Sequence, residues 1–278
     1  MLETSVWSSY FIELSPEEAI NAFLSCGFCR SELSDEHGKM LLDRGNPEKE
    51  GAKLKRFAEE RGFSFPQGHL LLRADICAEN AVETLKPWLD LFCAVGIKAG
   101  VLHAAGGADL TAEKRFERRV ETLRQLCEYI KGSCLTICLE NLRGDTVPVN
   151  ASELNDLIDA AGGEHLGICL DTGHLNLISP DSPRYQTQGD FIRETGERLM
   201  ALHIADNDTT SDMHLMPFGR GNIDWKDVMS SLKECGYKHL FNLEIPGERL
   251  APMPVKFMKL RYAREMCSFM LESQGKPN

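Results

Sequence analysis

Imidazole and carboxylate side chains stand at or near the ends of several short apolar runs in this sequence. In chain order they are His69, His103, Glu140, Asp171, His203 and Glu244. These groups are the usual protein ligands of divalent metals, although a histidine taken alone is more often structural. A carboxylate that follows an apolar run, as Glu140 does in TICLE, is costly to bury unless it is paired or bound to a metal. The pattern therefore predicts a metal site that includes Glu140, Asp171, His203 and Glu244.

A long polar segment after His203 carries a second set of chemically active residues. Arg220 lies there between two glycines, which would let the backbone approach a ligand while the guanidinium forks onto a carboxylate or phosphate. A tight turn with a solvent-exposed arginine is the alternative interpretation. Asp206 and Asp208 could orient a ligand imidazole or cap a turn. The further candidate ligands of this region are His174, Asp212 and His214.

Short apolar runs alternate with amphipathic stretches along nearly the whole chain. The runs predict strands over 5–12, 28–33, 64–69, 98–103, 135–140, 166–171, 200–204 and 239–244. The amphipathic stretches predict helices over 16–25, 51–61, 80–95, 112–130, 151–161, 190–198, 225–235 and 255–272. Eight such units predict an α/β protein with a single (β/α)8 TIM barrel domain over residues 1–278, rather than a doubly wound sheet. The candidate residues would then share the rim at which the strands end.

Composition narrows the classes of function. The chain has 31 basic and 42 acidic residues and a net charge of −11, which disfavours nucleic acid as a partner. It has no uninterrupted apolar run of about 18 residues, so no membrane span is expected. Its first residues lack the features of a secretory signal, so we expect a cytoplasmic protein with reduced thiols, among which Cys134, Cys138 and Cys169 would be buried. No exposed stripe proves a dimer, and a homo-oligomer stays open.

Five segments of the C-terminal half resemble the xylose isomerase-like TIM barrels, which include sugar isomerases, sugar epimerases and AP endonuclease IV. They are CLEN (138–141), GICLDTGHLNL (167–177), LHIADND (202–208), DMHLMPFGRGNIDW (212–225) and NLEIPGE (242–248). The resemblance is looser in the N-terminal half. It implies a divalent metal-dependent sugar or sugar-phosphate isomerase or epimerase, the cation being Mn²⁺, Zn²⁺, Co²⁺ or Mg²⁺.

The resemblance also implies roles for individual residues. Glu140, Asp171, His203 and Glu244 match the residues that hold one metal in the sugar epimerases. Glu140 and Glu244 would pass protons on opposite faces of the substrate, through an enediolate that the metal stabilises. The implied substrate-binding residues are His69, His103, His174 and Arg220. Thr146 stands where some ketose epimerases carry a further glutamate, so their substrate contacts cannot be assumed.

Other activities of the same superfamily remain open. Endonuclease IV resembles this chain in nine ligand positions of a three-zinc site, for which His69, His103, His174, Asp212 and His214 would join the four residues of the single-metal site. The acidic charge opposes this phosphodiesterase activity. A dehydratase or lyase, and a binding module with a structural metal, are the remaining alternatives. The residues that would choose among sugars include Trp7, Glu32 and Arg249, and Arg143 and Arg220 would suit either free or phosphorylated sugars.

Overall fold

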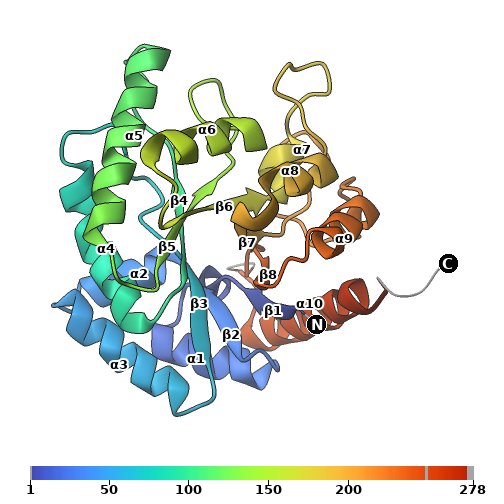
Figure 1. The fold of residues 1–278 in the computed structure, drawn as a ribbon. Coiled ribbons are helices and arrows are strands. Elements are labelled where there is room, and N and C mark those ends of the chain that lie inside the picture. The colour runs from blue at the N-terminus through green and yellow to red at the C-terminus, as the bar shows by residue number, and fades with distance from the viewer. Residues whose placement is uncertain (1, 248–249, 274–278) are drawn as a thin grey trace.

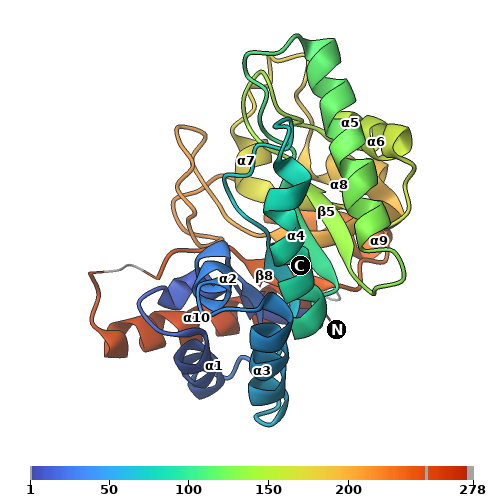
Figure 2. The ribbon, with the colours of Figure 1, turned by 90° about the vertical axis from the view of Figure 1, so that its left-hand side faces the viewer.

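The computed structural model describes residues 2–247 and 250–273. Within these residues, eight strands alternate with helices, and the helices lie outside the strands (Figures 1 and 2). The strands are β1 (Glu3–Val6), β2 (Arg30–Leu33), β3 (Ser64–His69), β4 (Ala99–His103), β5 (Thr136–Glu140), β6 (Leu166–Asp171), β7 (Leu199–His203) and β8 (Leu240–Leu243). Glu248, which ends one of the five motifs, and Arg249 lie outside the described residues.

The helices follow the expected order with three additions. They are α1 (Pro16–Ser25), α2 (Asp35–Leu42), α3 (Pro47–Glu59), α4 (Ala81–Val95), α5 (Ala112–Tyr129), α6 (Ala151–Ala161), α7 (Thr172–Asn176), α8 (Gln188–Thr195), α9 (Trp225–Glu234) and α10 (Met253–Ser273), with 3-10 helices η1 (Ser8–Phe11) and η2 (Gly196–Arg198). Of these, α2, α7 and η1 were not predicted. None of the described helices combines the length and the apolar character needed to cross a bilayer.

All strand pairs are parallel, and they form two hydrogen-bonded sheets. One sheet contains β2 to β7 in sequence order, and the other pairs β1 with β8. Single parallel bridges, Trp7 with Glu32 and Ile204 with Leu243, connect the two sheets. The predicted α/β class and the eight strands are confirmed, whereas regular ladders do not continue from β1 to β2 or from β7 to β8. Because the strands are parallel and ordered, their C-terminal ends lie at one edge.

Local sequence signals explain where many helices begin and end. The Ser15 side chain accepts a hydrogen bond from the Glu18 amide, and the Glu18 side chain accepts one in return, which makes a complete capping box for α1. Asn150 caps α6, because its side chain accepts a hydrogen bond from the Glu153 amide. Gly96 ends α4 in the left-handed region at φ 89°, a conformation that costs glycine little. These helix boundaries were therefore predictable.

The first predicted strand is wrong in its second half. The strand ends at Val6, and residues 8–11 form η1, whose Phe11 ring packs 5.7 Å from the Phe257 ring of α10. In addition, the Tyr10 hydroxyl donates to the Lys256 carbonyl at 2.9 Å. This contact brings the last helix beside the first strand, as Figure 1 shows at the meeting of β1 and α10. Tertiary packing thus overrides the apolar run that suggested a continuous strand.

Small side chains fill part of the space enclosed by the strands. Ala99, Val101, Cys138, Cys169 and Ala201 form a buried cluster of their own, separate from the large core between strands and helices. Every second residue of a strand points to the same side. Val101 and Cys138 therefore lie one layer below His103 and Glu140 on the same side of their strands. Burial of Cys138 and Cys169 agrees with the prediction.

Cys134 is exposed, contrary to the prediction. It precedes β5 and lies outside the enclosed layer.

Candidate active site and metal centre

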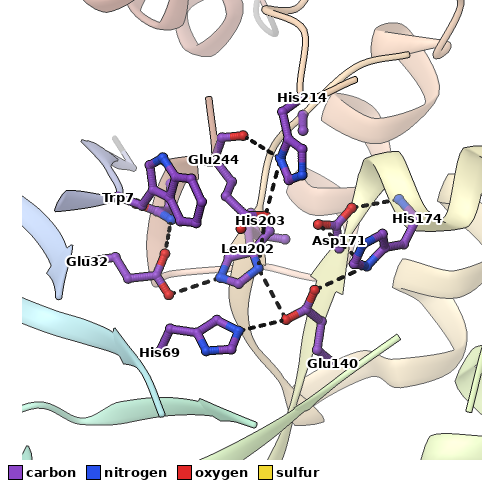
Figure 3. Close-up of polar contacts among 12 residues, drawn as sticks. Trp7, Glu32, His69, Glu140, Asp171, His174, Leu202, His203, His214 and Glu244 are labelled. Atoms are coloured by element: carbon purple, nitrogen blue, oxygen red, sulfur yellow. Dashed lines mark hydrogen bonds and ion pairs between the residues drawn. The ribbon is translucent and has the colours of Figure 1, made fainter. Parts of the chain in front are cut away.

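The C-terminal ends of β3 to β7 bring five of the predicted side chains together, and Glu244 joins them directly after β8. Figure 3 shows His69, Glu140, Asp171, His203 and Glu244 of this set. Strand register places His103 opposite Glu140 and Asp171 opposite His203. Five of the six side chains are buried, and His103 is partly exposed. The predicted common rim is therefore present in the structure.

Glu140 is the centre of this cluster. Its Oε2 atom lies 3.4 Å from His69 Nε2, 3.2 Å from His103 Nε2 and 3.3 Å from His203 Nδ1. Its Oε1 atom lies 3.2 Å from His174 Nδ1. Four imidazoles therefore face one buried carboxylate, which can accept hydrogen bonds but has no proton to donate when ionised.

Glu244 lies on the other side of His203. Its Oε2 atom is 3.4 Å from His203 Nδ1 and 3.8 Å from His214 Nδ1. The ring of Trp7 stacks on His214 with centroids 6.1 Å apart and planes 8° from parallel. Trp7 was expected among residues that choose the substrate, and the structure places it against this candidate ligand.

The two glutamates differ in the direction of their pKa shifts. Burial acts to raise the pKa of Glu140, but the positive charges of His203 and His103 outweigh burial and hold that pKa well below its usual range. Burial raises the pKa of Glu244 to about 8, even though His203 and His214 act in the opposite direction. The same desolvation strengthens the interactions among all charges in the cluster.

The histidines respond to the carboxylates around them. Burial would lower the pKa of His203 and of His174, but anionic neighbours raise both well above the usual value. Burial likewise opposes protonation of His214, yet the hydrogen bond to Asp212 and the charge of Glu244 raise its pKa to about 10. The site therefore has a strong negative potential, which would attract a cation.

The residues present fit a divalent metal. Each of the four predicted metal ligands has a buried atom with no hydrogen-bond partner among the described residues: Glu140 Oε2, Asp171 Oδ2, His203 Nδ1 and Glu244 Oε2. His69 Nε2 and Asp212 Oδ1 of the same cluster are also unpartnered. Donor atoms of Asp171, His203 and Glu244 lie within 4.8 Å of one another. Buried polar atoms normally have partners, so these orphaned oxygen and nitrogen atoms of one cluster match the donor set of a metal site.

Asp171 shows how the fold directs one of these atoms. Its Oδ1 atom accepts a hydrogen bond from the His174 amide at 2.7 Å and thereby caps α7. Its backbone amide donates to the Asn141 side chain at 2.7 Å, and that side chain donates back to the Asp171 carbonyl at 3.0 Å. Only Oδ2 is left to face the cluster. The short helix α7, which was not predicted, therefore positions both Asp171 and His174.

The remaining candidate ligands join the same network. Asp212 Oδ2 lies 3.2 Å from His174 Nε2, and Asp212 Oδ1 lies 3.4 Å from His214 Nε2. Donor atoms of His69, His103 and Glu140 lie within 4.8 Å of one another and form a second group with metal-ligand chemistry. All nine positions named from the sequence are thus in one connected cluster.

Glu32 has a position that sequence reasoning missed. It was expected among the residues that choose the sugar, but it is fully buried, and its Oε1 atom lies 2.9 Å from His203 Nε2. A carboxylate can only accept, so Nε2 carries a proton, and Nδ1 is the nitrogen that would offer its lone pair to a metal. The other Glu32 oxygen accepts from Asn242, which in turn accepts from the Ser5 hydroxyl at 2.8 Å.

The alternation of side-chain directions along β2 indicates where the Glu32 side chain points. Leu33 belongs to the core between strands and helices, so the neighbouring Glu32 side chain faces the opposite side of β2, toward the space enclosed by the strands. Its role was not predicted because Glu32 lies one residue before the end of β2, whereas the predicted ligands stand at the strand ends.

The Arg220 segment behaves as the turn interpretation described. Arg220 is exposed. Hydrogen bonds from Thr210 lower the pKa of Asp208, and the positive charge of Arg220 acts in the same direction. Asp206 accepts hydrogen bonds from the Ile223 amide at 3.2 Å and from Trp225 Nε1 at 2.9 Å. A Cβ atom on Gly221 would collide with the Asp206 carboxylate, so this glycine accommodates Asp206. Asp206 therefore holds the loop, and Arg220 stays a candidate for substrate contact.

Comparison with known proteins agrees with the motifs. A family model described as xylose isomerase-like TIM barrel matches residues 25–271. The D-psicose 3-epimerase of Enterocloster bolteae is 26% identical over 202 residues, which are 67% of this chain and 63% of that protein. A probable endonuclease 4 of Mycoplasmopsis synoviae is 22% identical over 134 residues, or 47% of each chain. The chain thus spans less than two thirds of the length of these curated relatives.

Solved structures extend the likeness to nearly the whole chain. The structure of an L-ribulose 3-epimerase superposes with a TM-score of 0.79 at 19% identity, covering 99% of this chain and 96% of the other. At that identity the likeness concerns the fold. Together with the match over residues 25–271, it shows that the chain belongs to the xylose isomerase-like TIM barrel family.

Proposed function

We propose that the protein is a divalent metal-dependent isomerase that epimerises or isomerises a sugar or sugar phosphate. The observation that carries this proposal is the set of four buried, unpartnered donor atoms on Glu140, Asp171, His203 and Glu244. The printed activity of the D-psicose 3-epimerase relative supports the choice of reaction. We further propose that the two sheets act as one closed (β/α)8 barrel, in a single domain.

Glu140 and Glu244 would carry out the proton transfers. Both side chains approach His203 Nδ1, at 3.3 Å and 3.4 Å, and both keep one unpartnered oxygen. One carboxylate removes the proton next to a carbonyl, and the other returns a proton on the opposite face, which epimerises that carbon. Return of the proton to the neighbouring carbon would instead give isomerisation.

The other residues bind and orient. A bound divalent cation would supply electrophilic stabilisation of the negative charge that develops on the substrate oxygens. Asp171 and His203 would complete its protein ligands. We propose that His69, His103 and His174 contact sugar hydroxyls, because each has a ring nitrogen at this rim, and that Arg220 closes over the substrate from the loop. Burial of the carboxylates would keep solvent protons away from the reacting carbon.

Exchange of substrate hydrogen with solvent tests this proposal. The protein would be loaded with Mn²⁺ or Co²⁺ and incubated in D₂O with free and phosphorylated ketoses, and deuterium at carbon would be followed by NMR. We expect exchange and product formation with at least one sugar, and loss of both with Glu140→Gln or Glu244→Gln. Glu83→Gln, which removes an exposed carboxylate of α4, is the control. Absence of exchange across free and phosphorylated sugars would contradict the proposal.

Phosphodiester cleavage is the second candidate. The observation that favours it is the convergence of all nine candidate ligands, including the group of His69, His103 and Glu140. The net charge of −11 opposes binding of a duplex at physiological salt. Incubation of the zinc-loaded protein with a duplex that contains one abasic site, over a series of salt concentrations, distinguishes the two activities. Cleavage at low salt would favour this candidate over the isomerase.

A further inference from the structure

A cavity of about 600 Å³ opens at the end of the strands opposite to the metal-ligand cluster. It is lined by the first residues of five strands: Glu3, Arg30, Ser64, Ala99 and Leu240. The ligand candidates stand at the other ends of the strands. On β3, the lining residue Ser64 lies roughly 16 Å from His69, and the deepest lining residue, Gln67, lies roughly 7 Å from it, at about 3.3 Å per residue. The cavity is therefore distinct from the candidate active site.

Basic side chains gather at this cavity, although the chain as a whole is acidic. Arg30, Lys55, Lys98 and Lys238 line it, against the two acidic residues Glu3 and Glu59. Arg30 pairs with Glu3 at 2.7 Å, and Lys55 lies 3.9 Å from Glu59.

Two of the cations remain without a carboxylate. Within residues 2–247 and 250–273, Lys98 and Lys238 have no ion pair. Both are exposed at the cavity, and His239 lies beside them. In a chain of net charge −11, this local excess of positive charge favours an anionic ligand.

The wall of the cavity is apolar. Phe63 and Phe65, whose rings meet edge to face at 5.2 Å, lie there with Val95 and Met200. Phe63, Phe65 and Val95 are buried and present only their edges to the cavity, whereas Met200 is partly exposed. Inorganic phosphate alone would leave these edges and Met200 in contact with water. An aromatic or otherwise apolar group on the ligand would cover it, with a gain that grows with the apolar area buried.

Gln67 supplies an independent sign of a ligand. It lines the cavity and is 1% exposed, and its Nε2 atom donates to the Leu202 carbonyl at 3.3 Å. Its Oε1 atom is buried and has no hydrogen-bond partner among the described residues. An unpaired acceptor of this kind is costly, and a hydroxyl or amino group of a ligand would satisfy it.

We propose that this cavity binds an organic phosphate of the nucleotide type, at a site separate from the candidate active site. The phosphates contact Lys98 and Lys238, the planar ring covers the apolar wall, and a hydroxyl or amino group donates to Gln67 Oε1. No bond is made or broken there. This proposal is independent of the proposed isomerase activity.

Calorimetric titration of the purified protein with ADP, pyrophosphate and adenosine tests the proposal. We expect ADP to bind at least about tenfold more tightly than either fragment, because each fragment lacks one half of the contacts. Pyrophosphate binding as tight as ADP binding would overturn the assignment of the apolar wall. Failure of ADP to bind would overturn the site itself.

Variants locate the binding. The double variant Lys98→Glu/Lys238→Glu should weaken ADP by about tenfold or more, since two attractive charges become repulsive. The control Lys49→Glu/Lys226→Glu makes the same charge change at exposed positions outside the cavity and should leave binding unchanged. Equal affinity in both double variants would place ADP elsewhere and refute the proposal. Gln67→Met should weaken ADP and leave pyrophosphate unaffected.

Discussion

Replacement of Glu32 by glutamine should weaken metal binding although Glu32 does not face the metal-ligand cluster directly. The carboxylate accepts from His203 Nε2 at 2.9 Å on one side and from Asn242 on the other. A glutamine can accept with only one of its two terminal atoms. Because the Ser5 hydroxyl holds the Asn242 oxygen at 2.8 Å, the Asn242 amide stays a donor. In the variant, the glutamine NH₂ group would therefore face another donor, either His203 Nε2–H or the Asn242 amide.

The expected loss of metal affinity follows from the loss of one charge-assisted hydrogen bond to the imidazole of His203. Such bonds contribute about 1.5–3 kcal/mol when buried, and loss of a support of this kind typically lowers metal affinity by about 10–100-fold. Glu32→Gln should therefore raise the dissociation constant of Mn²⁺ or Zn²⁺ within that range. The ring of His203 would lose the contact that fixes which nitrogen carries the proton.

Competition with a chromophoric chelator measures the affinity directly, without reliance on catalysis. Glu50→Gln is the matched control, because Glu50 is also a buried carboxylate with a hydrogen-bonded partner, Lys53, on the outer helix α3. It should leave metal affinity unchanged. A dissociation constant of Glu32→Gln within about threefold of the wild-type value would refute the positioning role of Glu32.

Three further predictions concern stability. Gly38→Ala should destabilise the fold by about 1–2 kcal/mol in urea unfolding, because a Cβ atom there would lie 2.6 Å from the buried Trp88 ring; a stabilised variant would contradict this packing. Burial lowers the pKa of His37, so neutral His37 contributes stability that is complete above the unfolded-state pKa and is lost as the pH falls through the folded-state pKa. Between pH 7 and 5 the wild type should therefore lose more free energy of unfolding than His37→Asn. Equal losses in the two proteins would contradict this prediction. Removal of divalent metal by a chelator should lower the melting temperature by several degrees, and by less in Glu244→Gln, as scanning calorimetry would show; an equal drop in both proteins would argue against Glu244 as a ligand.

The strand-end pattern was readable from the sequence because it depends on simple geometry. Parallel strands in sequential order bring their last residues to one edge, so His69, Glu140 and Asp171 had to lie near one another once the strands were correct. The predicted bounds of β3 and β6 agree with the structure at both ends. Alternation then fixed which side of each strand the neighbouring residues face.

The features of the fold and site that were not predicted depend on contacts between segments distant in the sequence. The contact of Glu32 with His203 could not be predicted, because the two residues lie 171 positions apart in the sequence and only the closed arrangement of the strands brings them together. Helix α2 was not predicted because it contains Gly38, a weak helix former. The Trp88 ring packs so close to this position that a Cβ atom would not fit. The orientation of Arg220 depends on the loop that Asp206 holds. The secondary-structure propensities of neighbouring residues do not reveal these long-range contacts.

Metal content per chain tests the central claim most directly. The protein would be purified without chelator or metal-affinity resin, and elemental mass spectrometry would be applied to the wild type and to a His203→Asn/Glu244→Gln variant. The account predicts about one divalent metal ion per chain in the wild type and a value near zero in the variant. A wild-type protein without bound metal, or a variant that retains it, would contradict the assignment of the buried cluster. About three zinc ions per chain would instead favour phosphodiester cleavage.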